Sequence, residues 1–155
     1  SMSDFELFYR GTYIEFSRFL ILDAPVLDRV DDLLQEAYYL VFKRFKKADI
    51  RDKKAYLFKV GWSLIKKEYK VRQEYPIDLQ VTSDKEDTEK KILERITLER
   101  LWHYLKTKDI VIQKCVYLYY LGMPNQEIAD ALHLSLAQVK NYLYRTFKEL
   151  REVLI

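Results

Sequence analysis

Apolar residues recur every three or four positions along most of this 155-residue chain, which is the spacing of one face of an α-helix. The pattern runs through residues 4–22, 27–47 and 52–71, and it returns from about residue 91 onward. Only three glycines and three prolines are available to interrupt it. The sequence therefore predicts an all-α fold with few turns.

Residues 73–93 break this periodicity. They are polar, they carry six acidic and three basic residues, and no apolar stripe can be traced through them. This composition is typical of a tether of limited order. We therefore expect two small helical domains, residues 3–72 and 94–155, joined by a polar linker, with Ser1 and Met2 interpreted as a tag remnant.

The last two expected helices carry the most specific local pattern. Asn125 is suited to cap a short helix, and the next helix follows after only three residues, "HLS". Both helices have one apolar face, and the long one is polar on its opposite side. This arrangement predicts a helix-turn-helix, although a plain amphipathic hairpin has the same pattern. The apolar faces consist of Ile128, Ala129 and Leu132, then Leu136, Val139, Leu143, Phe147 and Leu150.

A basic stretch precedes the linker. Residues 43–72 hold twelve Lys or Arg and only three Asp or Glu, interleaved with Tyr, Phe and Trp. A local excess of positive charge among aromatic residues is typical of a nucleic-acid-binding surface. A solvated, lysine-rich helix face is the alternative, and the charge pattern does not distinguish the two.

Three segments of the chain resemble those of one bacterial protein family, in the same order. They are "VDDLLQEAYYLVFKRF" at 30–45, "AYLFKVGWSLIKKEYKVR" at 55–72, and "KDIVIQKCVYLYYLGMPNQEIADALHLSLAQVKNYLYRTFKELRE" at 108–152. They are similar to helices of extracytoplasmic-function (ECF) sigma factors, the subunits that direct RNA polymerase to promoters. The resemblance implies that this chain binds core RNA polymerase and promoter DNA.

In the family, the helix corresponding to residues 30–45 docks on the clamp helices of the largest catalytic subunit of the polymerase. The resemblance therefore implies a polymerase-binding set of Asp32, Gln35, Glu36 and Tyr39. These residues are expected to face outward, opposite the apolar stripe of the same helix, so that the helix packs with one face and binds with the other. That stripe consists of Leu34, Ala37, Val41 and Phe45.

The following loop and helix would, by resemblance, recognise and melt the −10 element of the promoter. Melting requires cations that hold phosphates and aromatic surfaces for an extruded base. Tyr56, Trp62 and Tyr69 are candidate stacking groups, although core packing explains Trp62 equally well. The predicted −10 contacts are Lys46, Lys47, Arg51, Lys53, Lys54, Lys59, Trp62, Ser63, Lys66, Lys67 and Lys70.

The C-terminal domain would, by resemblance, read the −35 element in the major groove. Gln and Asn can read base edges, while Ser, Lys and Arg hold phosphates. His133 stands in the turn where the family often has glycine, which is tolerable because His is enriched at positive φ. The predicted −35 contacts are Ser135, Gln138, Lys140, Asn141, Arg145 and Lys148.

Other classes of function find little support in the sequence. It contains no phosphate-binding glycine loop or nucleophile–base motif, so we expect no enzyme and no cofactor. The single Cys115 is expected to be a buried thiol, and His103 and His133 are too isolated for a metal site. No segment is apolar enough to insert into a membrane, so a cytoplasmic protein is expected.

Two other functions stay open at this stage. The chain could be a helix-turn-helix regulator that binds DNA without being a polymerase subunit, or a sigma-like adaptor that binds a protein partner. The resemblance also implies control by an anti-sigma factor wedged between the two helical domains.

Overall fold

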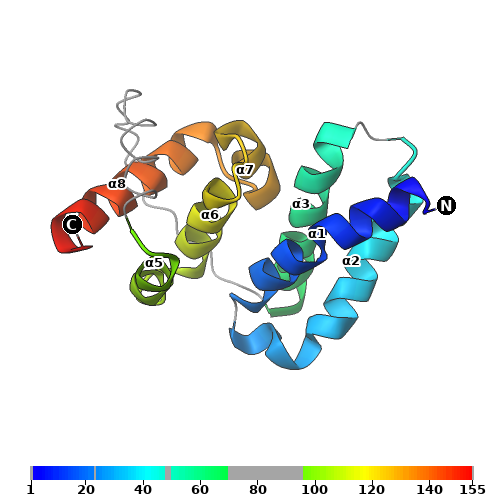
Figure 1. The fold of residues 1–155 in the computed structure, drawn as a ribbon, viewed down its shortest axis with the longest axis horizontal. Helices are drawn as coiled ribbons and strands as arrows, with labels where there is room; N and C mark the ends of the chain where they lie inside the picture. Colours follow the sequence, from blue (N-terminus) through cyan, green and yellow to red (C-terminus); the bar gives the residue numbers. More distant parts are fainter. Residues whose placement is uncertain (1, 23, 48–49, 70–95, 155) are drawn as a thin grey trace. The chain divides into compact units, whose positions relative to one another are not determined.

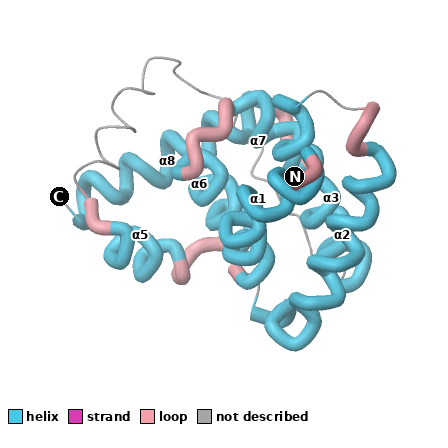
Figure 2. Tube along the Cα trace, turned by 45° about the vertical axis from the view of Figure 1, so that its right-hand side comes forward, coloured by secondary structure: helices cyan, strands magenta, loops and turns pink. Residues whose placement is uncertain are grey.

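The computed structural model describes residues 2–22, 24–47, 50–69 and 96–154 (Figure 1). Every regular element within these ranges is helical (Figure 2), which confirms the all-α prediction. The expected linker, residues 73–93, lies outside the described residues.

The N-terminal helices are α1 (Asp4–Ile21), the 3₁₀ helix η1 (Ala24–Arg29), α2 (Val30–Arg44) and α3 (Ile50–Tyr69). Ser3 caps α1, since its Oγ accepts a hydrogen bond from the Glu6 amide over 3.2 Å. The prediction that the second α-helix begins near Leu27 was wrong, because the segment before Val30 takes the tighter 3₁₀ geometry.

The C-terminal helices are α5 (Leu98–Leu105), α6 (Ile110–Tyr120), α7 (Asn125–Leu132) and α8 (Leu136–Leu154). The predicted three-residue turn therefore separates α7 from α8. Asn125 was predicted to be the N-cap of α7, but it is the first residue of that helix. The amide of Ile128 donates to the carbonyl of Pro124 over 3.0 Å, so Pro124 takes the cap position.

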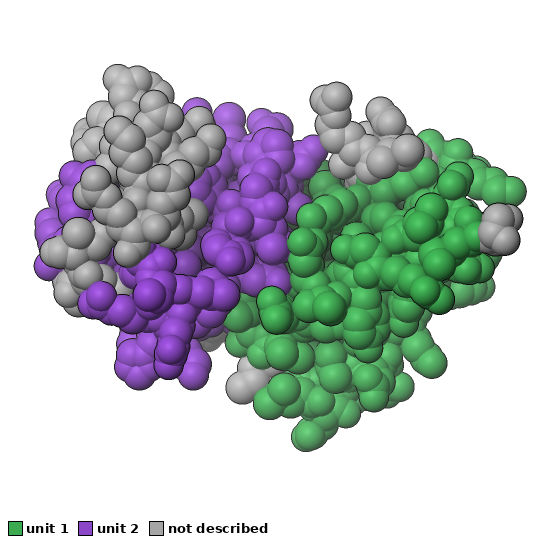
Figure 3. Space-filling model, in the orientation of Figure 1, with its two compact units in different colours: residues 1–72, 130–133 green, residues 73–129, 134–155 purple. Residues whose placement is uncertain are grey.

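Contacts between Cα atoms divide the chain into two compact units (Figure 3). Unit 1 comprises residues 1–72 and 130–133, and unit 2 comprises residues 73–129 and 134–155. The helices α1, α2 and α3 belong to unit 1, and α5, α6 and α8 belong to unit 2.

Aromatic rings form the centre of unit 1. Phe58 of α3 meets Phe16 and Phe19 of α1 edge-on, with ring centroids 5.6 and 5.0 Å apart. Such edge-to-face pairs are favourable beyond the area they bury. Phe16 also contacts Gly61, since a Cβ added there would lie 2.6 Å from the ring. The absence of a side chain at Gly61 therefore lets α1 and α3 pack closely.

The apolar stripe of α8 faces α6 in unit 2. Val139, Leu143, Phe147 and Leu150 are buried, as predicted, and the rings of Phe147 and Tyr119 lie 5.7 Å apart. Cys115 is also buried, as expected. At the other side of α6, Tyr117 packs 5.3 Å from Trp102 of α5. The helix α6 therefore holds α5 and α8 together.

Two successive helices end in the same way. Gly122 (φ 87°) follows α6 and His133 (φ 57°) follows α7, each in the left-handed region, and the positive φ expected at His133 is confirmed. After α7, Leu134 donates to the Ala129 carbonyl over 2.9 Å, and His133 donates to the Asp130 carbonyl over 3.4 Å. This is a Schellman motif, which ends a helix and turns the chain sharply.

A polar cluster joins α5 to the far half of α8. The Tyr104 hydroxyl and the Lys108 ammonium both donate to Oε2 of Glu149. These donors hold the pKa of the Glu149 carboxyl below its usual range, with Lys108 the larger cause. The Glu149 carboxylate therefore holds α8 against the C-terminal end of α5.

The two helical glycines provide a matched test of the packing. Gly61→Ala should destabilise the protein by about 1–3 kcal/mol, because the new methyl group meets the buried Phe16 ring. Gly11→Ala should instead stabilise the protein by up to about 1 kcal/mol, because its methyl group meets nothing within 4 Å and alanine favours helix. Urea unfolding followed by circular dichroism measures both. Equal effects of the two substitutions would contradict the packing described for Phe16.

Candidate nucleic-acid interface

Ser135 and Gln138 exchange hydrogen bonds at the start of α8. The Gln138 amide donates to Oγ of Ser135 over 3.1 Å, and the Ser135 amide donates to Oε1 of Gln138 over 2.8 Å. This reciprocal pair is a capping box, which satisfies two backbone amides that have no partner within the helix. The side-chain NH₂ of Gln138 stays available to a base edge, whereas bidentate reading of adenine would require breaking the cap.

This structural role of Gln138 was not predicted. The residue was expected only to contact DNA, although Ser135 and Gln138 have the spacing of a capping box. The signal was therefore present in the sequence. Both roles are compatible, since a cap fixes the position of the side chain that a base would meet.

Cationic side chains line the outward side of α8. Arg145 and Lys148 are exposed, and Lys140 is half-buried. Cations along one side of a helix can hold phosphates on both sides of a groove while the first turn of the helix approaches the bases. These three predicted contacts are accessible.

Asn141 differs from the expectation. Helical spacing puts it opposite the apolar stripe of α8, yet the residue is only 3% exposed. Periodicity gives the direction of a side chain relative to its own helix, but it does not say what else packs there. Asn141 is therefore not open to a base edge in this conformation.

The helix α2 presents the predicted polymerase-binding set on one side. Asp32, Gln35, Glu36 and Tyr39 are all exposed, and the opposite stripe is buried at Leu34, Ala37 and Val41 and half-buried at Phe45. Asp32 already has a basic neighbour, because Nε of Arg29 lies 3.7 Å from its carboxylate. Arg29 also pairs with Glu68 of α3 over 3.0 Å. Asp32 therefore has a basic neighbour, whereas Glu36 makes no ion pair with any residue that the structure describes.

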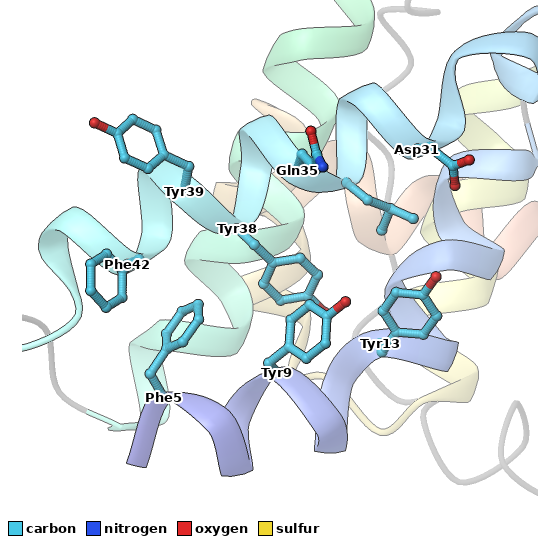
Figure 4. Close-up of a pocket in the computed structure, with 9 residues that line it drawn as sticks. Phe5, Tyr9, Tyr13, Asp31, Gln35, Tyr38, Tyr39 and Phe42 are labelled. Atoms are coloured by element: carbon cyan, nitrogen blue, oxygen red, sulfur yellow. The ribbon is translucent and has the colours of Figure 1, made fainter. Parts of the chain in front are cut away.

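An aromatic groove of about 620 Å³ runs between α1 and α2 beside this face (Figure 4). Tyr9 and Tyr38 meet across it with ring centroids 4.6 Å apart, and Phe5 meets Phe42 at 5.0 Å. Burial raises the pKa of Tyr38 to about 12, and its hydroxyl lies 2.8 Å from that of Thr12. The lining consists of Phe5, Tyr9, Tyr13, Asp31, Leu34, Gln35, Tyr38, Tyr39 and Phe42.

The groove was not predicted from the sequence. Phe5, Tyr9 and Tyr13 stand four residues apart in α1, and this spacing indicates one helical face without showing which of the three is exposed. The structure leaves Tyr9 and Tyr13 partly exposed, so they form an apolar wall next to Gln35 and Tyr39. The α2 face is therefore a polar rim beside an aromatic groove.

Several cations of the basic stretch already have partners in unit 1. The Lys54 ammonium lies 2.8 Å from the Glu15 carboxylate, and the Lys53 ammonium lies 3.9 Å from the centroid of the Phe45 ring. Lys46 and Lys47, after the end of α2, are exposed. The side chain of Arg51 and all of Lys70 lie outside the described residues.

Further along α3 the predicted residues separate into two groups. Lys67 is exposed, whereas Lys59, Ser63 and Lys66 are half-buried. Trp62 is fully buried, so its ring is not accessible to a base in this conformation. Burial removes its large apolar surface from water, which is favourable. This position agrees with the alternative that Trp62 packs in the core. Tyr56 is half-buried and accepts a hydrogen bond from Arg44 over 3.2 Å.

Neither a metal cluster nor a membrane span is found in the part of the chain that the structure describes. No group of three or more His, Cys, Asp or Glu side chains there could hold a metal ion. No helix there is long and apolar enough to cross a bilayer.

Comparison with known protein families finds one match. The family model described as "Sigma-70, region 4" matches residues 113–150, from within α6 to within α8. The matched segment includes the complete helix-turn-helix and covers less than half of the chain. No curated protein and no solved structure matches the chain significantly.

This match supports a sigma-70 family protein without indicating a subfamily. The matched family is a DNA-binding domain of transcription factors and not an enzyme, in agreement with the sequence-based expectation. Binding of DNA at the −35 element is the role of that domain. The C-terminal helices are therefore similar to a promoter-binding module.

The capping box yields a stability prediction. Gln138→Ala should destabilise the protein by roughly 0.5–1 kcal/mol, because the Ser135 amide loses its acceptor. Gln138→Glu should be nearly neutral, since glutamate keeps an acceptor oxygen and its charge is favourable at a helix start. Urea unfolding of the two variants measures the difference. Equal stabilities would argue against the reciprocal cap.

Proposed function

We propose that this protein is an ECF-type sigma factor, which binds core RNA polymerase and directs initiation of transcription at specific promoters. The observation that carries the proposal is the match to sigma-70 region 4 over a helix-turn-helix whose second helix presents accessible cations. The exposed polar face of α2, in a segment that resembles the polymerase-docking helix of the family, supports it.

The helix α8 would contact the −35 element through two kinds of group. Lys140, Arg145 and Lys148 would hold phosphates, and these contacts set affinity and register. The capped Gln138 would offer its NH₂ group to a base edge. Asn141 would have to become exposed before it could read a base edge.

The helix α2 would contact the clamp helices of the largest polymerase subunit. Its exposed carboxylates suit basic partners, and the adjoining groove would accept apolar side chains from the same surface. Gln35 and Glu36 would be the main polar contacts, because Asp32 already lies 3.7 Å from the Arg29 guanidinium. Tyr39 would form the aromatic edge of the contact.

The −10 element would be held mainly by charge. Lys46, Lys47 and Lys67 are exposed and would meet phosphates of the displaced strand. Tyr56 is a better stacking candidate than Trp62, because part of its ring is accessible. Trp62 would serve the fold that positions these groups.

The proposed function brings two further proposals with it. A sigma factor works where RNA polymerase works, so the protein would act in the bacterial cytoplasm. Its regulation would come from an anti-sigma partner that competes for the polymerase-binding face.

One experiment distinguishes this function from its alternatives. The full chain is mixed with bacterial core RNA polymerase and a promoter library, and RNA start sites are mapped. Complex formation with new, specific start sites is expected. Sequence-specific DNA binding without polymerase would instead indicate an independent regulator, and failure to bind either would leave a protein-interaction adaptor.

Substitutions on α2 test the docking face. Gln35→Lys and Glu36→Lys should each weaken core-polymerase binding by about a hundredfold, because a like charge is brought against basic clamp residues at a cost of about 2–5 kcal/mol. Binding is measured by fluorescence anisotropy of the labelled protein. The control is Glu6→Lys, a similar change at an exposed position of α1 outside the groove. Wild-type affinity in both α2 variants would contradict the assignment.

Substitutions on α8 test promoter recognition separately. The double variant Lys140→Ala/Arg145→Ala should keep polymerase binding and lose at least about tenfold in specific transcript, because two phosphate contacts disappear. The slope of log affinity against log salt for the holoenzyme should fall by about 2. The matched control, Lys106→Ala/Arg151→Ala, removes the same charge from exposed positions outside the first turns of α8. If the two double variants reduce specific transcription equally, the loss of positive charge and not its position on α8 is responsible for the effect.

A further inference from the structure

The helix α1 carries an apolar stripe on its solvent side. Leu7, Ile14 and Ile21 are exposed by 57%, 62% and 42%, respectively. They stand seven residues apart, which places them above one another along one side of the helix. Single exposed apolar residues are ordinary, but three at heptad spacing form a continuous seam. This seam has the spacing used by helices that pack against a second helix.

The seam is distinct from the surfaces already described. The buried face of α1 includes Phe16, Phe19 and Leu20, which points Leu7, Ile14 and Ile21 to the opposite side of the helix. None of the three lines the aromatic groove. The core and the groove therefore account for the rest of the apolar surface of α1, but not for these residues.

Gly11 lies beside the seam, between Leu7 and Ile14. A Cβ added at Gly11 would meet nothing within 4 Å, so no contact within the described residues requires glycine there. A glycine inside a helix costs about 0.5–1 kcal/mol relative to alanine. A small residue beside an apolar seam lets the backbone of a second helix approach closely. Gly11 and the seam therefore point to the same kind of partner.

The charges beside the seam indicate which partner fits. Arg10 and Arg18 flank it on either side, are exposed, and make no ion pair with any residue that the structure describes. They stand four residues before and after Ile14. An antiparallel second copy centred on Ile14 would therefore put Arg10 opposite Arg18, and a parallel copy would put each arginine against itself. Like charges at these positions disfavour self-association.

We propose that the outer face of α1, formed by Leu7, Arg10, Gly11, Ile14, Arg18 and Ile21, docks an acidic amphipathic helix of another protein. Apolar residues at heptad spacing on that helix would cover the seam, and carboxylates about two turns apart would pair with the two arginines. This surface is separate from the α2 face and the recognition helix, and it does not rest on the promoter function.

A pair of designed peptides tests the proposal. One peptide of about 21 residues has leucine at the a and d heptad positions and glutamate at e and g, and its twin has lysine in place of each glutamate. Affinity for the full chain is measured by fluorescence anisotropy. The glutamate peptide should bind at least about tenfold more tightly than the lysine twin, and Arg10→Glu/Arg18→Glu should reverse this preference.

Two single variants test the seam itself. Ile14→Ser should lose peptide binding, because it removes the centre of the apolar surface. Gly11→Gln should weaken binding several-fold without lowering the melting temperature, because its side chain extends into open space. Circular dichroism confirms that both variants are folded.

Several outcomes would overturn the proposal. They are equal binding of the two peptides, full binding by Ile14→Ser, and dimerisation of the wild-type chain that Ile14→Ser abolishes in sedimentation. Binding to vesicles of anionic phospholipid that exceeds peptide binding and is lost in Ile14→Ser would assign the seam to a membrane surface instead.

Discussion

The contact between the Phe16 ring and Gly61 is the constraint on which unit 1 depends. Because residue 61 has no side chain, Phe16 reaches the surface of α3 and packs against Phe58. The same ring meets Tyr38 of α2 edge-on at 5.6 Å. One aromatic side chain therefore connects all three α-helices, and it orients α2 so that Leu34 and its stripe face inward. The exposure of Gln35 and Glu36 follows from that orientation.

The fold was largely predictable from the sequence because each helix buries one face at the period of an α-helix. That pattern located the buried stripe of α8 at Val139, Leu143, Phe147 and Leu150, and the turn that holds His133. It could not place the start of α2, since a 3₁₀ helix and an α-helix share apolar spacing over one turn. It also could not distinguish Trp62 in the core from Trp62 at a surface, because an aromatic residue on a basic helix satisfies both patterns.

The candidate site was less predictable, because the direction in which a side chain leaves its helix does not determine whether that side chain is exposed. Asn141 and Arg145 both lie away from the apolar stripe of α8, yet Asn141 is buried and Arg145 is exposed. Gln138 differs in another way: it is half-buried, and its side-chain oxygen accepts a hydrogen bond from the Ser135 amide at the start of the helix. Lys114 of α6 is fully buried, although a lysine is ordinarily expected at the surface. Each case depends on neighbours that helical spacing does not report.

The two surfaces of α1 differ in charge, and this difference has a consequence for assembly. The groove beside α2 is lined by Asp31 and Gln35, and Glu36 is exposed on the adjoining face of α2, so this side favours a basic partner, whereas Arg10 and Arg18 flank the outer seam. A partner suited to one surface is repelled by the other, so charge directs each partner to its own side of the helix. Because the two sides of α1 face away from each other, both partners can bind at once. Taken together, the two proposals would let unit 1 bind RNA polymerase through α2 and an acidic helix through the outer face of α1.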